Sequence, residues 1–224
     1  MLSYQSLDTV NNISVVGTGT IGASWATYFL SKGFKVNAWD PSDGWKQRIL
    51  SFINNAWPQI QSLGFIGEFK ETNIILCSSL EEALTGTDFV QESAPEQLKL
   101  KQSLFKQIDE YTSKNIIVSS STSGLIMSDM QDRLENANRF VVGHPFNPPH
   151  LIPLVEVLGG KNTDVLAVDW AINFYNKIGK HAIKLKKEVP GHLANRLQAA
   201  LWREAVLAVQ NDLASVEDIN CLLY

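Results

Sequence analysis

A histidine and a glutamate in the second half of the chain have the setting of an acid–base pair. His144 follows the apolar run Phe140–Gly143, and a proline-rich turn comes directly after it. Glu156 stands 12 residues further on, inside the apolar run Leu154–Leu158. A carboxylate is costly in such surroundings unless it is paired. Paired with His144, it would fix the tautomer of the imidazole and raise its basicity, as a general base that works near neutral pH requires.

A glycine-rich segment near the start of the chain could hold a phosphate group. Gly17, Gly19 and Gly22 have the spacing G-x-G-x-x-G and follow the β-branched run Ile13–Val16. The first glycine permits a tight turn, the second lets the backbone approach a pyrophosphate, and the third lets a helix pack closely on a strand. The N-terminus of that helix favours negative charge. The segment therefore predicts a dinucleotide site.

An acidic residue after the next apolar run bears on the choice of dinucleotide. Asp40 stands 18 residues after Gly22 and directly follows Lys35–Trp39. A carboxylate there would accept hydrogen bonds from the adenosine ribose and would repel a 2′-phosphate. The alternative is that Asp40-Pro41 is only a turn that ends a strand. With strand, glycines, helix and acid in register, we expect NAD as the cofactor.

Polar side chains stand where a substrate oxygen could be bound. The segment Ser119-Ser120-Ser121-Thr122-Ser123 marks the end of the apolar run Ile116–Val118, where doubly wound folds bind ligands. For most of its members a helix-capping loop is the simpler interpretation. Asn195 lies among apolar residues and could satisfy a backbone group or reach a substrate oxygen. A base, polar groups and a nicotinamide are what the oxidation of a secondary alcohol needs.

The other histidines lack such a setting. We expect His150, His181 and His192 to be surface or structural residues. No histidine or cysteine spacing indicates a metal site. The two cysteines, Cys77 and Cys221, form neither a C-x-x-C pair nor a disulfide scaffold, so a reducing compartment and a cytoplasmic location are the default expectation.

The elements that must position these residues alternate between short β-branched runs and longer helical patterns. This alternation predicts an α/β protein with a Rossmann-type, doubly wound, mostly parallel sheet. We expect strands at Ile13–Val16, Lys35–Trp39, Ile74–Cys77, Phe89–Glu92, Ile116–Ser119, Phe140–Gly143, Leu154–Val157 and His181–Leu185. We expect helices at Ile21–Lys32, Gly44–Leu63, Glu96–Tyr111 and Val165–Ile178.

The pattern changes after the last of these strands. A long apolar-periodic helix is expected from near Pro190, which suits a first helical turn, and no strand follows it. We therefore place a boundary in the charged joint 186–189. The prediction is an NAD-binding domain over residues 1–187, followed over 188–224 by the start of an all-α domain for substrate binding or dimerisation.

Charge and hydropathy exclude two classes of partner. The chain has 19 Lys and Arg against 23 Asp and Glu, and no segment concentrates the basic residues, so we expect no nucleic acid partner. Residues 9–31 carry no charge, but Asn, Ser, Thr and Gly interrupt the stretch. A buried strand running into a buried helix explains it better than a membrane span.

Taken together, five motifs resemble the 3-hydroxyacyl-CoA dehydrogenase family from about residue 10 onward. They are Gly17–Gly22 with Asp40, the segment 91–96 (QESAPE), Ser121-Thr122-Ser123, His144-Pro145-Phe146-Asn147-Pro148, and the segment 190–196 (PGHLANR). Glu96 with Lys101, and the continuation from Pro148 to Glu156, look more like the branch of L-gulonate 3-dehydrogenase (lambda-crystallin) and L-carnitine dehydrogenase.

The resemblance implies a role for each matching residue. His144 would be the catalytic base and Glu156 its orienting partner. The polar groups around the substrate oxygen and the nicotinamide would be Ser123, Asn147 and Asn195. The resemblance also implies a further set of NAD contacts, at Asp40, Glu96 and Lys101 and at the backbone of Thr20 and Ile21. It further implies a homodimer that acts on a small molecule.

One departure from the family bears on the substrate. Family members that act on CoA thioesters carry a lysine-rich helix after the second strand, whereas the segment 43–63 has only Lys46 and Arg48. A cluster of cations is a simple way to hold polyphosphate. Its absence favours a small L-3-hydroxy acid or betaine, of L-gulonate or L-carnitine type. A short-chain 3-hydroxyacyl-CoA dehydrogenase and a non-catalytic, NAD(H)-binding structural protein remain as alternatives.

Chain length adds one more expectation. About 185 residues serve the cofactor domain, which leaves roughly 35 for a helical domain that usually needs about a hundred for its own core. In the family, helices after this point are expected to form the dimer interface and much of the substrate pocket. We therefore expect a substrate domain that is cut off or completed by another chain.

Overall fold

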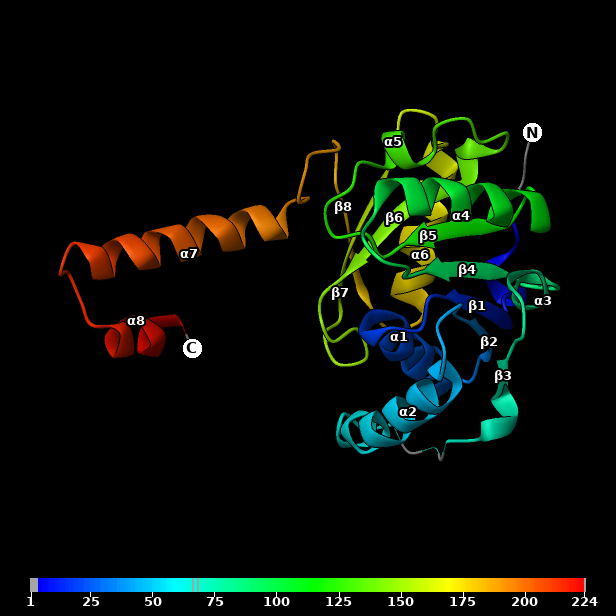
Figure 1. Ribbon diagram of the computed structural model, residues 1–224, viewed down its shortest axis with the longest axis horizontal. Helices are drawn as coiled ribbons and strands as arrows, with labels where there is room; N and C mark the ends of the chain where they lie inside the picture. Colours follow the sequence, from blue (N-terminus) through cyan, green and yellow to red (C-terminus); the bar gives the residue numbers. More distant parts are fainter. Residues whose placement is uncertain (1–3, 66, 68, 224) are drawn as a thin grey trace.

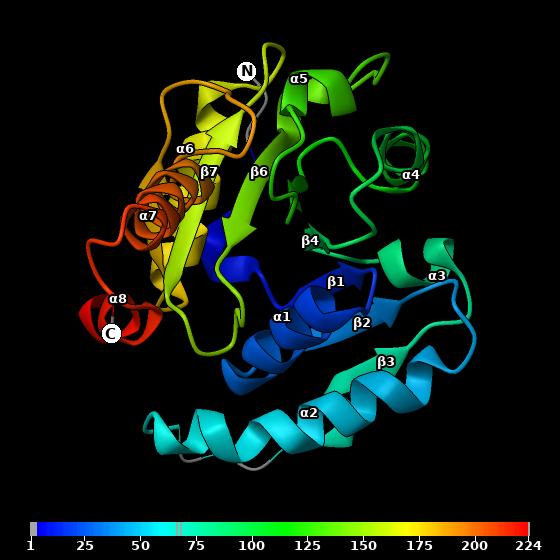
Figure 2. The ribbon, with the colours of Figure 1, turned by 60° about the vertical axis from the view of Figure 1, so that its left-hand side comes forward.

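An eight-stranded sheet forms the centre of the molecule in the computed structural model, which describes residues 4–65, 67 and 69–223. Its order is β3-β2-β1-β4-β5-β6-β7-β8, and neighbours are parallel except β6 and β7 (Figures 1 and 2). The strands are β1 Asn12–Val16, β2 Lys35–Trp39, β3 Ile74–Leu76, β4 Phe89–Glu92, β5 Ile117–Ser120, β6 Phe140–Pro145, β7 Leu154–Gly159 and β8 His181–Lys184. The predicted doubly wound, mostly parallel fold is confirmed.

Helices cover both faces of this sheet and bury two apolar clusters. The helices are α1 Thr20–Ser31, α2 Trp45–Ser62, α3 Leu80–Leu84, α4 Leu98–Tyr111, α5 Met127–Met130, α6 Val165–Lys177, α7 Ala194–Gln210 and α8 Val216–Leu223. One cluster joins the sheet to α1, α2 and α6, and the other joins it to α3, α4 and α5. The short helices α3 and α5 were not expected, since four or five residues give too little period to detect.

Aromatic rings make up the centre of the first cluster. Trp25 stacks on Phe29 with ring centroids 5.2 Å apart, and Phe89 lies 4.4 Å from Phe174. Tyr175 packs on Trp25 at 5.5 Å. All five side chains are buried, and removing one such ring from a close-packed core costs about 3–5 kcal/mol. This core fixes the strand ends that carry the polar residues discussed below.

Two helix starts differ from the sequence prediction. The long helix expected from Pro190 begins at Ala194, because Gly191 and His192 both have positive φ, which no α-helix accommodates. Asn195 therefore lies in the first turn of α7 rather than one turn further in. The helix expected from Glu96 begins at Leu98, which leaves Glu96 on a loop.

The last two helices lie apart from the sheet. Figure 1 shows α7 and α8 extending away from the α/β body, and none of the residues of α7, all of which the structure describes, is buried. The expected boundary at 187/188 falls between β8 and α7 and stays a prediction. Within the described part of the chain, none of the helices has the length and apolar character to cross a bilayer.

Candidate active site

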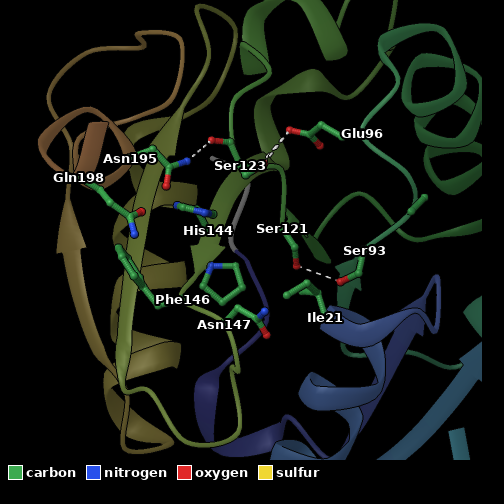
Figure 3. Close-up of a pocket in the computed structure, with 12 residues that line it drawn as sticks. Ile21, Ser93, Glu96, Ser121, Ser123, His144, Phe146, Asn147, Asn195 and Gln198 are labelled. Atoms are coloured by element: carbon green, nitrogen blue, oxygen red, sulfur yellow. Dashed lines mark hydrogen bonds between the residues drawn. The ribbon is translucent and has the colours of Figure 1, made fainter. Parts of the chain in front are cut away.

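A cavity of about 450 Å³ lies at the carboxyl ends of the central strands, where doubly wound folds bind their ligands. Figure 3 shows that its lining side chains come from α1, the loops after β4 and β5, the end of β6 and the start of α7. They are Ile21, Ser93, Ala94, Glu96, Ser121, Ser123, His144, Pro145, Phe146, Asn147, Asn195 and Gln198. The fold thus brings together the predicted residues His144, Ser123, Asn147, Asn195 and Glu96.

His144 and Glu156 form the pair that the sequence predicted. They are directly opposite each other on the antiparallel strands β6 and β7, and His144 Nδ1 lies 2.8 Å from Glu156 Oε2. Cross-strand partners have neighbouring side chains, so the 12-residue separation becomes a contact once these strands pair. The carboxylate accepts, so Nδ1 carries the hydrogen and Nε2 is left with the lone pair.

Glu156 has a second task that the sequence did not indicate. Its other oxygen, Oε1, accepts hydrogen bonds from the backbone N–H groups of Leu193 at 3.1 Å and Ala194 at 2.9 Å, at the N-terminus of α7. Burial alone would raise the pKa of Glu156, but the bonds from His144 and from these N–H groups outweigh it and lower the pKa. The carboxylate is therefore ionised near neutral pH and joins β6, β7 and α7.

Glu96 binds the loop that follows β5 through several hydrogen bonds. Its Oε1 accepts hydrogen bonds from Thr122 Oγ1 at 2.6 Å and from the N–H groups of Ser123 and Gly124 at 2.9 and 3.0 Å. Burial would raise the pKa of Glu96, but the Thr122 bond, the Lys101 charge and these N–H groups lower it. The carboxylate thus positions the loop that carries Ser123, and it lines the cavity itself.

Asn195 fulfils one of its two expected roles and is placed for the other. Its Nδ2 donates to the carbonyl oxygen of Ser123 at 2.8 Å, which satisfies a backbone group. The same side chain lines the cavity beside His144, so its amide oxygen lies within the site (Figure 3). Its action on a substrate oxygen stays a prediction.

The glycine turn and Asp40 line a second, neighbouring cavity of about 670 Å³. Gly17 has φ +88°, and a Cβ on Gly22 would collide with the carbonyl oxygen of Gly17, so both positions need glycine. A Cβ on Gly19 would meet nothing within 4 Å, which leaves open space in front of the N-terminus of α1. These features fit a pyrophosphate on the helix N-terminus.

Asp40 lies at the end of β2, as the ribose-binding role requires. Its carboxylate accepts hydrogen bonds from the N–H groups of Thr18 at 2.7 Å and Ser42 at 2.9 Å. Burial would raise the pKa of Asp40, but these bonds and the one from the Ser42 hydroxyl lower it. The fixed negative charge at the cavity wall suits a 2′-hydroxyl and opposes a 2′-phosphate.

Lys101 is buried beneath the loop that follows β4, and its contact with the cofactor stays a prediction. Its side chain is 1% exposed, and its Nζ donates to Glu92 Oε1 at 2.7 Å and to the carbonyl oxygen of Ala94 at 3.0 Å. A buried ammonium group bound in this way is held beneath the loop that it anchors. Lys101 also fixes the segment after β4 that borders both cavities, a role that only its neighbours in space reveal.

His192 is a buried residue next to the candidate base. Its ring packs on His144 with centroids 5.2 Å apart, and its Nε2 donates to the carbonyl oxygen of Thr122 at 3.1 Å, so it has the structural role that the sequence allowed for it. The expectation holds for His150, which is buried and bonded to Ser24, and for the exposed His181. Burial lowers the pKa of His192, and the neighbouring His144 lowers it further.

Three cavity residues were not singled out from the sequence. Ser93, Phe146 and Gln198 line the site; Ser93 and Phe146 belong to the motifs at 91–96 and 144–148, whereas Gln198 belongs to none of the motifs. Among the described residues, no three His, Cys, Asp or Glu side chains gather closely enough to hold a metal ion.

The sequence of this chain is similar to those of known dehydrogenases. Residues 12–189 match the family model described as 3-hydroxyacyl-CoA dehydrogenase, NAD binding domain. An L-carnitine dehydrogenase from Streptomyces griseus is 48% identical over 211 residues, which cover 94% of this chain and 63% of that protein. The chain thus spans less than two thirds of the length of that relative.

Two solved structures share the fold over most of the chain. A 5-formyl-3-hydroxy-2-methylpyridine 4-carboxylic acid 5-dehydrogenase, described as an NAD+ dependent dismutase, gives a TM-score of 0.87 at 30% identity, covering 95% of this chain and 69% of that one. A (S)-3-hydroxybutyryl-CoA dehydrogenase from Ralstonia eutropha gives 0.85 at 28%, covering 94% and 75%.

The glycine turn, Asp40 and the family match agree on the cofactor, which is NAD. The match covers β1 through β8 and includes both His144 and Glu156. This chain therefore belongs to the 3-hydroxyacyl-CoA dehydrogenase family and contains its NAD-binding domain.

Proposed function

We propose that this chain supplies the cofactor site and the acid–base pair of an NAD-dependent dehydrogenase. Its substrate would be a small L-3-hydroxy acid or betaine of L-carnitine type, whose 3-hydroxyl is oxidised to the ketone. The observation that carries the proposal is the buried His144–Glu156 pair, which leaves His144 Nε2 as the free base in a cavity next to the dinucleotide turn.

Each residue of the cavity has a task in this reaction. His144 Nε2 accepts the hydroxyl proton, and the negative charge of Glu156 stabilises the imidazolium that results. Ser123, Asn147 and Asn195 supply polar groups around the substrate oxygen and the nicotinamide. NAD, when bound, supplies the acceptor for the hydride that leaves C3.

The lining of the cavity supports a betaine over an acyl-CoA. The twelve residues that line it include one carboxylate, Glu96, and one phenyl ring, Phe146, but no Lys or Arg. A quaternary ammonium group is attracted by a carboxylate and by the face of an aromatic ring. A CoA polyphosphate would instead require cations on the helix after β2, where the segment 43–63 has only Lys46 and Arg48. The Streptomyces griseus relative, named for L-carnitine, supports the same choice.

The test is the substitution His144→Gln. With the base removed, turnover of L-carnitine with NAD should fall by about 10²- to 10⁴-fold, while NADH binding, followed by its fluorescence, should stay within twofold. His181→Gln is the matched control, because His181 is exposed on β8 and lies outside the cavity. Undiminished turnover in His144→Gln would refute the role of His144.

A substrate panel tests the choice of substrate. L-carnitine, L-gulonate and 3-hydroxybutyryl-CoA would be compared by kcat/KM, with this chain and with any longer form that its source encodes. Preference for the thioester would favour the acyl-CoA alternative and a place in fatty acid metabolism. NADH binding without oxidation of any of these compounds would favour a non-catalytic role.

The apolar side of α7 and α8 supports a homodimer. Leu201, Trp202 and Val206 are exposed there, beside a groove of about 610 Å³ between the two helices. Unpartnered apolar patches of this kind mark protein interfaces. Light scattering after size-exclusion chromatography should give twice the 24.9 kDa chain mass. A cytoplasmic location remains a prediction from the sequence.

A further inference from the structure

A chain of hydrogen bonds runs from the apolar core to the wall of the active-site cavity. Ser119 on β5 lies 2.7 Å from the hydroxyl of Tyr175 on α6, and that hydroxyl donates to Gln91 Oε1 on β4 at 2.6 Å. Gln91 Nε2 then donates to Ser121 Oγ at 2.9 Å. Tyr175, Gln91 and Ser119 are fully buried, whereas Ser121 borders the cavity.

Counting donors and acceptors shows which group donates in each of these hydrogen bonds. The single hydrogen of Tyr175 is used on Gln91 Oε1, so Ser119 must be the donor to Tyr175. The amide of Gln91 is then held with its nitrogen toward Ser121. Because Ser121 Oγ accepts from Gln91, its own hydrogen points to another acceptor, which is either Ser93 Oγ at 2.9 Å or, when Ser93 is the donor of that bond, a group in the cavity. Burial raises the pKa of Tyr175, so that hydroxyl keeps its proton.

Gly143 on β6 has no side chain, and this leaves space in the core for these polar groups. A Cβ at Gly143, the residue before His144, would collide with both Ser119 Oγ and the Tyr175 hydroxyl. A polar chain buried among aromatic rings is costly unless all its members are satisfied. Gly143 therefore permits a costly feature that an all-apolar packing would avoid, and such features are often associated with a functional site.

Ser121 lies where the two cavities meet. Its hydroxyl is 2.9 Å from that of Ser93 (Figure 3), and Ser93, Ile21 and Ala94 line both the cavity of the glycine turn and the cavity of His144. A dinucleotide that begins at the glycine turn must pass this junction for its reactive ring to reach His144. The group that meets Ser121 and Ser93 is therefore part of that ring or its substituent.

We propose that Tyr175 and Gln91 are positioning residues that make Ser121 a hydrogen-bond donor to the carboxamide oxygen of the nicotinamide. An acceptor oxygen of the substrate is the other source of the same chemistry, and the experiment below separates the two. The inference concerns the NAD site of the family and does not depend on the L-carnitine-type substrate.

The test compares NADH with ADP-ribose, which lacks the nicotinamide, by calorimetric titration of Tyr175→Phe. Loss of a hydrogen bond of this kind should weaken NADH binding by about three- to tenfold, while ADP-ribose binding should not change. Tyr28→Phe is the matched control, because Tyr28 also donates a buried hydrogen bond, to the carbonyl oxygen of Ile178, but is not connected to the cavity. It should change neither affinity.

Ser121→Ala provides a second route if Tyr175→Phe does not fold, since Ser121 is only half-buried. It should reproduce the selective loss of NADH affinity, and the double variant should lose no more than either single one. The reduced 3-acetylpyridine analogue keeps the carbonyl oxygen but lacks the amide nitrogen, so it should lose affinity by the same factor as NADH.

Three results would overturn the proposal. One is equal weakening of NADH and ADP-ribose in Tyr175→Phe, which would mean a general structural role. Another is unchanged NADH affinity in both Tyr175→Phe and Ser121→Ala, including the case in which only the KM of the substrate rises. The third is an acetylpyridine analogue that is insensitive to Ser121→Ala, because Ser121 would then serve the amide nitrogen.

Discussion

The first and last long helices of this chain both carry many apolar residues but lie in opposite environments. Helix α1 buries every residue from Gly22 to Ser31, whereas α7 buries none of its residues. Trp25 on α1 is 0% exposed, and Trp202 on α7 is 67% exposed. Figure 1 shows α1 within the α/β body and α7 extending away from it. An apolar pattern thus predicts a helix, but not whether the same chain covers it.

The two regions are also held by different forces. The α/β body depends on apolar burial between helices and sheet. The start of α7 is attached by polar contacts, namely Glu156 to the N–H groups of Leu193 and Ala194, and Asn195 to the carbonyl oxygen of Ser123. The candidate active site lies where α7 meets the α/β body, so its geometry should respond to charge more than the body does.

The largest expected effect is on the stability of the body. Phe89→Ala removes a fully buried ring that contacts Phe174, Trp170 and Tyr175, and it should lower the free energy of unfolding by about 3–5 kcal/mol. Urea unfolding followed by circular dichroism measures this. A loss below about 1 kcal/mol would mean that the aromatic cluster does not support the sheet as described.

The next effect concerns the joint between the regions. Glu156→Gln should cost about 1.5–3 kcal/mol near neutral pH, because charged hydrogen bonds to His144 and to the start of α7 are weakened. The folded-state pKa of Glu156 is lowered, so its stabilisation is complete above the ordinary value of 4.5 and is lost as the pH falls through the lowered value.

The difference between wild type and Glu156→Gln should therefore narrow on acidification. Urea midpoints of both proteins, measured from about pH 7 to pH 3, give this difference directly. A gap that stays constant over the whole range would show that the carboxylate charge of Glu156 does not stabilise the joint.

A smaller effect is expected in cofactor selection, which belongs to the body alone. Asp40→Asn removes the charge and keeps one acceptor oxygen, so it retains the hydrogen bond from either Thr18 or Ser42, which donate to different oxygens of Asp40. The ratio of NADP+ to NAD+ affinities should rise by about tenfold, which corresponds to roughly 1.4 kcal/mol. Calorimetric titration of both dinucleotides measures the ratio. An unchanged ratio of affinities would mean that Asp40 only takes part in a turn that ends the strand and does not select the cofactor.

The smallest effect is expected on the exposed face of α7. Trp202→Ala should change the free energy of unfolding of the monomer by less than about 0.5 kcal/mol, because the ring is mostly in water already. Dilute protein in the same urea experiment as Phe89→Ala gives the direct comparison. A loss of several kcal/mol would mean that Trp202 is covered in solution, which would favour the proposed dimer.

Residues that interact within one element or between paired strands could be predicted from the sequence. The glycine turn and Asp40 belong to one strand–helix–strand unit, and His144 and Glu156 lie on strands that pair directly. Residues that interact across layers could not. Gln91 and Tyr175 are 84 positions apart, and nothing in either segment indicates that α6 packs over β4 and β5.

The sequence by itself determined the strands, the longer helices and the cofactor turn, and it predicted the pairing of His144 with Glu156, because local periodicity, special backbone conformations and a carboxylate in an apolar strand indicate them. Only the tertiary structure decided that Glu156 also caps α7, that Lys101 is buried beneath the site, and that a buried tyrosine reaches Ser121. These depend on which side chains meet across layers of the fold, and that follows from the packing of the whole chain.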